Sequence, residues 1–203
     1  MKVFLLIAMV GHAICGVSDC LITYTPHGKV LLTNFKDYEQ SKVSFKDMPL
    51  KNLNLAMLLG FVAIVMQTFG YMELCDWVKQ YSNTMYWCMY VSALVIFVSL
   101  TSHHMFCCIA EWFFVRLDRT KQALEASWGF FKATAYTMYV GYLAILVYYA
   151  TMLIAIASGV TELPKWACLL TPIPLALVVV PTKLPAKANI VCAITFLAMY
   201  ILI

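Results

Sequence analysis

The feature that most restricts the fold of this chain is a series of long apolar stretches that carry almost no charge. The stretch from Met85 to Val115 contains one acidic residue and no Lys or Arg. A helix needs about 20 mainly apolar residues to cross the hydrocarbon core of a bilayer. Hydrophobic residues make up 63% of the 203 residues and charged residues 12%, which is more apolar than a soluble domain requires. We therefore expect an all-α fold, a polytopic bundle of transmembrane helices.

Six apolar runs are predicted as transmembrane helices within a single transmembrane domain, over residues 3–24, 52–74, 85–115, 128–157, 166–182 and 188–203. The first run has the lysine and apolar core of a signal peptide, but we expect it to be a retained span. The fifth run is short and contains Pro172 and Pro174, which cannot donate backbone hydrogen bonds. Residues 25–50 are rich in charged and turn-forming side chains and are predicted to form a polar cytoplasmic loop, either a lid or a tether.

Basic residues indicate the orientation, because cytoplasmic loops of membrane proteins carry an excess of Lys and Arg. Lys79 and Lys165 follow the even-numbered spans, and Lys2 precedes the first. The other eleven basic residues follow the odd-numbered spans: Lys29, Lys36, Lys42, Lys46, Lys51, Arg116, Arg119, Lys121, Lys132, Lys183 and Lys187. The sequence therefore predicts a multi-pass protein of the cell membrane with both termini outside the cytoplasm. Its expected partner is the lipid bilayer and not a nucleic acid, and its oligomeric state stays open.

Ionisable side chains interrupt two of the predicted spans. His103, His104 and Glu111 lie in the third span, where a charged group near the bilayer centre costs about 3 kcal/mol. The first span contains His12 and Asp19, which are seven residues apart and share a helix face. Because lipid is a poor environment for these groups, we expect His12, Asp19, His104 and Glu111 to face inward and meet between the first and third spans.

The residue types in this cluster are those that perform acid–base chemistry in enzymes. The expected catalytic groups are His104, Glu111, Asp19 and His103. The expected substrate contacts are His12, Ser99, Thr101 and Tyr136.

Several interpretations of the cluster remain open. The histidines and carboxylates could bind zinc or iron, work as acid and base without a metal, or relay protons. Alternatively, Asp19 pairs with a histidine of the third span and only joins two helices. Glu111 lies seven residues from His104, about 10 Å along a helix, which is long for two ligands of one ion. We therefore predict no bound metal and leave the cofactor undefined.

The favoured function is an enzyme that acts on a lipid or another apolar substrate from the cytoplasmic leaflet, since polar and reactive groups lie beside apolar walls. A small carrier or proton-coupled transporter is the first alternative, suggested by the interrupted fifth span, His12 and Gln67. Gln67 itself is expected to hydrogen-bond across helices. The second alternative is a structural or assembly protein whose polar groups only lock helices together.

Three short patterns resemble known families. Gly16-x-x-Asp19 followed by Leu21-Ile22-x-Tyr24-x-Pro26, with a later histidine-bearing span, resembles an uncharacterised family of small bacterial multi-span membrane proteins, a domain of unknown function. Ser99-x-x-x-His103 with Asp19 is similar to the alkaline ceramidase and adiponectin receptor superfamily of membrane zinc hydrolases, which implies seven spans and a later histidine pair. No histidine follows His104, so that part of the zinc site has no counterpart here. His104 with Glu111 also resembles the sterol isomerases, at a different spacing.

Overall fold

The computed structural model describes residues 2–30 and 34–203, most of which are helical. The six longest helices are α1 (Val3–Thr23), α3 (Leu50–Lys79), α4 (Asn83–Arg116), α5 (Lys121–Thr134), α6 (Tyr136–Ala157) and α8 (Lys187–Leu202). The shorter elements are β1 (Tyr24–Thr25), β2 (Gly28–Lys29), η1 (Asn34–Lys36), α2 (Tyr38–Ser44), η2 (Lys165–Leu170) and α7 (Pro172–Val179). The part of the predicted 25–50 loop at residues 31–33 lies outside the described residues. The prediction of an all-α fold is confirmed for the described residues, apart from a β-hairpin whose two strands have two residues each.

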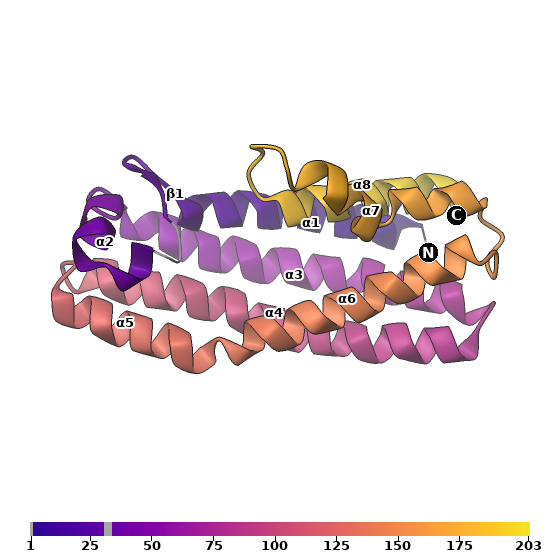
Figure 1. Cartoon of the computed structure of the whole chain (residues 1–203), viewed down its shortest axis with the longest axis horizontal. Helices are drawn as coiled ribbons and strands as arrows, with labels where there is room; N and C mark the ends of the chain where they lie inside the picture. The colour runs from indigo at the N-terminus through magenta and orange to yellow at the C-terminus, as the bar shows by residue number, and fades with distance from the viewer. Residues whose placement is uncertain (1, 31–33) are drawn as a thin grey trace.

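The long helices run side by side along one axis (Figure 1). Both termini lie at one end of the bundle, which we call the terminal end. The β-hairpin, α2 and the beginning of α5 lie at the opposite end, which we call the loop end (Figure 1). Helix α1 packs on α3 and α8, and α4 packs on α3 and α6. The pairs α1–α8 and α4–α6 therefore form two sides of the bundle, with α3 in contact with both α1 and α4.

Four segments are long and apolar enough to cross a membrane: Val3–Thr23, Leu50–Lys79, Asn83–Arg116 and Lys121–Ala157. Their outer surfaces expose large apolar side chains, such as Leu58 (60% exposed), Val98 (71%) and Leu143 (63%). A continuous apolar surface of this kind is typical of contact with lipid. Helix α8 is also apolar but has only 16 residues.

The predicted fifth span, 166–182, does not form one continuous helix. It is divided into the 3-10 helix η2 and the eight-residue α7, which is about 12 Å long by helix rise. Pro172 and Pro174 lie in the first turn of α7, where missing backbone donors cost little, so the chain begins a new helix there. The expected count of six spans is therefore not reproduced by helix length alone.

The predicted fourth span, 128–157, begins earlier than expected and contains a break. Thr120 caps α5 by accepting a hydrogen bond from the backbone N–H of Ala123 at 3.2 Å. Helix α5 ends at Thr134, and α6 begins after Ala135. The first turns of α5 contain charged residues, including Lys121 and Glu125. The apolar pattern of the sequence therefore did not show that the helix begins there.

Small residues allow α1 and α3 to pack closely. A Cβ atom on Gly11 would lie 2.8 Å from the Ala63 carbonyl oxygen, and one on Gly70 would overlap the side chain of Ala8. Contacts this short require glycine at both positions.

The described part of the loop between α1 and α3 is partly buried. Phe35, Phe45 and Met48 belong to a second apolar core with Phe114 and Leu124 at the loop end. The Arg119 guanidinium donates hydrogen bonds to the carbonyl oxygens of Phe45 (2.7 Å) and Met48 (3.0 Å). This segment therefore closes the ends of α4 and α5.

We expect Arg119→Lys to loosen this loop, because lysine cannot form both hydrogen bonds with the fork of donors that arginine provides. Hydrogen bonds from a charged donor contribute about 1.5–3 kcal/mol each at most, so the melting temperature should fall and proteolysis within residues 37–48 should accelerate. Arg116→Lys is the matched control, since Arg116 is exposed. Equal proteolysis rates in the two variants would contradict this role.

Candidate functional site

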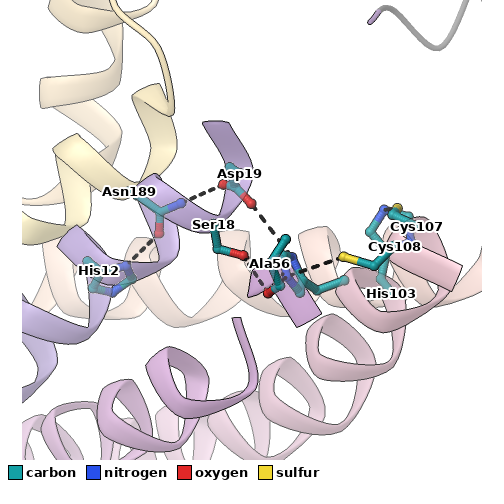
Figure 2. A network of polar contacts seen from close by, with 9 residues as sticks. His12, Ser18, Asp19, Ala56, His103, Cys107, Cys108 and Asn189 are labelled. Carbon is teal, nitrogen blue, oxygen red and sulfur yellow. Dashed lines mark hydrogen bonds and ion pairs between the residues drawn. The ribbon is translucent and has the colours of Figure 1, made fainter. Parts of the chain in front are cut away.

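A chain of polar contacts connects α1, α8 and α4 inside the bundle (Figure 2). The Asp19 Oδ1 atom lies 3.6 Å from His104 Nδ1, within ion-pair distance. Asn189 donates its side-chain amide to Asp19 Oδ2 at 2.7 Å, and its Oδ1 lies 3.1 Å from His12 Nδ1. The predicted meeting of Asp19 and His104 between the first and third spans is therefore confirmed, and Asn189 joins His12 to them.

The other ring nitrogen of His104 faces α3 and a serine of α1. Ser18 donates a hydrogen bond to the Ala56 carbonyl oxygen at 2.8 Å. The Nε2 atom of His104 lies 3.1 Å from Ser18 Oγ and 3.3 Å from the same carbonyl. Oxygen atoms therefore lie close to both ring nitrogens and fix the orientation of the imidazole.

Ser18, His104 and Asp19 have the connectivity of a serine hydrolase triad, in which serine and carboxylate contact opposite nitrogens of one histidine. Ser18 is fully buried, and its hydroxyl proton is directed to Ala56. A nucleophile must reach the substrate. We therefore assign Ser18 a positioning role for His104 and not a catalytic one.

A cavity of about 850 Å³ adjoins this network, between the α1–α8 and α4–α6 sides of the bundle. This volume is in the range of pockets that bind small molecules. Ile64, Ile96 and Leu100 contribute to an apolar wall. On its exposed side the cavity is bordered by Tyr24, Lys29, Leu184 and neighbouring residues; Tyr24 is 42% exposed and Leu184 48%. The cavity therefore has its mouth between the β-hairpin and the loop that precedes α8.

Among the residues of the network, Asp19 is the most accessible from the cavity. Its side chain is 36% exposed, compared with 10% for His104. Asn189 and His104 hold the carboxylate from two sides. A carboxylate that is positioned in this way can accept or donate a proton to a ligand in the cavity.

His103 also lines the cavity but belongs to a separate group of contacts. Thr137 donates its hydroxyl proton to the Thr134 carbonyl at 2.7 Å, so its oxygen accepts from His103 Nδ1 at 3.4 Å. This leaves His103 Nε2 as an acceptor for the Cys107 thiol at 3.5 Å. His103 is therefore a neutral neighbour of the Asp19 group.

The mouth of the cavity includes the β-hairpin, which is anchored by one polar contact. His27 donates a hydrogen bond to the Asp47 carboxylate, and this hydrogen bond lowers the pKa of Asp47. The contact ties the hairpin to the segment that precedes α3. Tyr24 and Lys29, which line the mouth, are thereby held near it.

Four predicted site residues lie outside the cavity lining. Glu111 has one buried carboxylate oxygen without a partner among the described residues, one helical turn or more beyond the network. Ser99 packs next to Gly141. Thr101 donates to the Phe97 carbonyl one turn earlier, and Tyr136 is 63% exposed. His12, Asp19, His103 and His104 are the predicted site residues that line the cavity.

Two residues of the site, Ser18 and Asn189, were not assigned a role from the sequence, and Gln67 was expected to hydrogen-bond across helices. Asn189 is the one amide in an otherwise apolar last helix, and this is a signal of an interior contact. Gln67 lines the cavity, and its backbone nitrogen lies beside Gly11 of α1; the expected cross-helix hydrogen bond of its side chain stays a prediction. Ser18 carried no signal, because a serine on a membrane helix commonly bonds its own backbone.

Within residues 2–30 and 34–203, no group of three or more His, Cys, Asp and Glu side chains is arranged to hold a metal ion. The geometry therefore supplies no metal ligand set in that part of the chain. The absence of a bound metal stays a prediction.

We expect Gly60→Ala to disrupt the site, because a Cβ atom on Gly60 would overlap the His104 imidazole. Overpacking of this kind costs about 1–3 kcal/mol, so the melting temperature should fall and His104 should move from Asp19. Gly129→Ala is the control, since nothing lies within 4 Å of its added Cβ. If both variants melt at the wild-type temperature, the packing of His104 does not require glycine at position 60.

The comparisons with known proteins give a family but no activity. Residues 1–199 match DUF6796, which is described as a family of unknown function. No curated protein and no solved structure shows significant similarity to the chain. The match covers nearly the whole sequence, and it agrees with the resemblance to an uncharacterised family. The chain belongs to the DUF6796 family.

Proposed function

We propose that this protein is a membrane-embedded enzyme that performs acid–base chemistry on a lipid or another apolar substrate. The observation that carries this proposal is the Asp19 carboxylate, held by Asn189 and His104 at the wall of a largely apolar cavity. Such a combination of apolar walls and a few convergent polar groups is typical of sites for apolar ligands.

Asp19 is the proposed general acid or base, because it is the accessible member of the network. His104 and Asn189 are positioning residues that orient the carboxylate and stabilise its charge. Ser18 and the Ala56 carbonyl in turn fix the imidazole. His104, also an expected catalytic group, is only 10% exposed, and its Nε2 atom lies against Ser18 of α1 and the Ala56 carbonyl of α3.

The substrate proposed for this cavity is an amphiphile. Phe97, Leu100 and Ile145 offer contacts for an alkyl chain. Lys29 and Lys187 line the part of the cavity near the mouth, where a polar or anionic head group would be favoured. An amphiphile that enters through the mouth would place its chain along the apolar wall and pass Asp19.

We also propose the topology that the basic residues indicate, with the loop end in the cytoplasm and both termini on the other side. Six crossings result if η2 with α7, and then α8, pass through the membrane as a short pair. The common location of the termini (Figure 1) supports an even number of crossings.

Reporter fusions test this topology. Fusions after Ser44 and after Lys121 should both report a cytoplasmic location, because the basic loops favour that side. A fusion at the C-terminus should report the opposite location. A non-cytoplasmic signal from either internal fusion would exclude the proposed orientation.

For the enzymatic function, the test is Asp19→Asn in bilayers made from a total lipid extract, with products followed by lipid mass spectrometry. General acid–base catalysis contributes about 10²–10⁴-fold, so product formation should fall by at least about 100-fold while the melting temperature changes little. His104→Gln should cause a smaller loss and change the pH profile of the reaction. Gln122→Leu, an exposed position on α5, is the control. Turnover by Asp19→Asn at the wild-type rate would refute the assignment.

A carrier is the second candidate, and one observation favours it. A second cavity of about 550 Å³ opens near the terminal end and is lined by Glu73, Asp76 and Glu162. Buried side chains that include Tyr71, Leu74 and Tyr148 lie in the core between the two cavities. Two cavities separated by a closed layer are compatible with alternating access.

Accessibility of Cys107 distinguishes the two functions, because its thiol lines the first cavity. A variant that retains Cys107 as its sole cysteine is treated with a membrane-impermeant maleimide from each side. An enzyme that is open only at the cavity mouth should be labelled from the cytoplasmic side alone. Labelling from both sides would favour the carrier.

A further inference from the structure

Two buried polar atoms at the cavity lack hydrogen-bond partners among the described residues. They are His12 Nε2 and the amide nitrogen of Gln67. The two residues are 4% and 7% exposed, and both line the cavity that contains Asp19. Buried polar groups are nearly always paired with protein, water or ligand. These two atoms therefore indicate a binding partner inside the cavity.

The contacts of Asn189 define what His12 can bind. Asn189 uses its amide nitrogen to donate to Asp19, so its oxygen accepts from His12 Nδ1. The proton of a neutral imidazole is then on Nδ1, and Nε2 is an acceptor. The Gln67 amide nitrogen is a donor. The pair therefore presents one acceptor and one donor.

The side chains are held in place by their surroundings. The His12 ring packs against the rings of Phe196 and Tyr71, with centroids 5.5 Å and 6.0 Å from its own. The preceding Gly11 packs against the backbone of Gln67, since a Cβ atom there would lie 3.1 Å from the Gln67 nitrogen. Helices α1 and α3 therefore bring His12 and Gln67 to the same part of the cavity.

We propose that His12 and Gln67 form a subsite for a hydroxyl group of the ligand. A hydroxyl donates its proton to His12 Nε2 and accepts from the Gln67 amide, so one group satisfies both atoms. His12 precedes Asp19 by seven residues, about 10 Å along the helix. This inference rests on the proposed function, and it defines the substrate as an amphiphile with a neutral hydroxyl about two helical turns deeper than its reacting group.

The test compares two probes that differ only in the hydroxyl: dodecan-1-ol and its methyl ether. Affinities for the full-length protein in detergent are measured by native mass spectrometry. The wild-type protein should bind the alcohol about tenfold more tightly, because the ether cannot donate to His12. His12→Phe should reduce this ratio to about one by weakening the alcohol alone. Gln67→Met should weaken both probes, because the alcohol and ether oxygens each accept from the Gln67 amide. Gln122→Leu, on the surface of α5, should keep the tenfold ratio.

The outcomes separate this subsite from the proposed enzyme. Equal wild-type affinities for the two probes would overturn the subsite and assign the two atoms to bound water. This comparison uses the wild-type protein alone, so it does not depend on whether any variant folds. A preference that survives His12→Phe, unchanged affinities in Gln67→Met, or a preference lost only in Asp19→Asn would also overturn it and leave the enzymatic proposal standing. A preference that depends on His12, together with wild-type lipid turnover by Asp19→Asn, would keep the subsite and refute the enzyme.

Discussion

The close approach of α1 to α3 determines where every polar group of the cavity lies. Gly11 packs against Ala63 of α3, and this contact leaves no room for a larger side chain. The same approach brings Ser18 within 2.8 Å of the Ala56 carbonyl oxygen. Gly60 then leaves the space that the His104 ring of α4 occupies. Three helices are therefore arranged around one imidazole, and the carboxylate of Asp19 is placed beside it.

Polar groups in an apolar bundle are stable only where they find partners, since an unpaired buried group retains its full desolvation cost. Asp19 meets this requirement through Asn189 and His104. His12 and Gln67 meet it only in part, because each leaves a nitrogen without a partner in the described structure. The cavity therefore combines a fully supported carboxylate with a polar region that is incomplete. This difference is the reason for proposing a ligand site and not only a set of side chains that join helices.

Apolar packing and hydrogen bonds hold residues 34–48 against the loop end of the bundle. At the loop end, aromatic side chains of residues 34–48 cover the ends of α4 and α5, and Arg119 binds their carbonyl oxygens. This cover lies beside the cavity mouth, which the β-hairpin and residues 184–187 border. The lid interpretation of the loop therefore fits the hairpin better than α2, since none of the described residues 34–48 lines the cavity.

The sequence by itself determined the class of fold, because long runs without charge can be satisfied only as helices in lipid. It also indicated that Asp19 and His104 would meet, since each needs a partner away from lipid. Periodicity could not tell which residues of a helix face a cavity, so Glu111 and Tyr136 were included although they lie outside the lining. Ser18 and Asn189 were assigned by tertiary structure alone, and only that structure placed Gln67 at the cavity, because these roles depend on contacts between helices distant in the sequence. The local sequence shows that a polar group must be buried at a cost in free energy. Only the packing of the helices determines which partner offsets that cost.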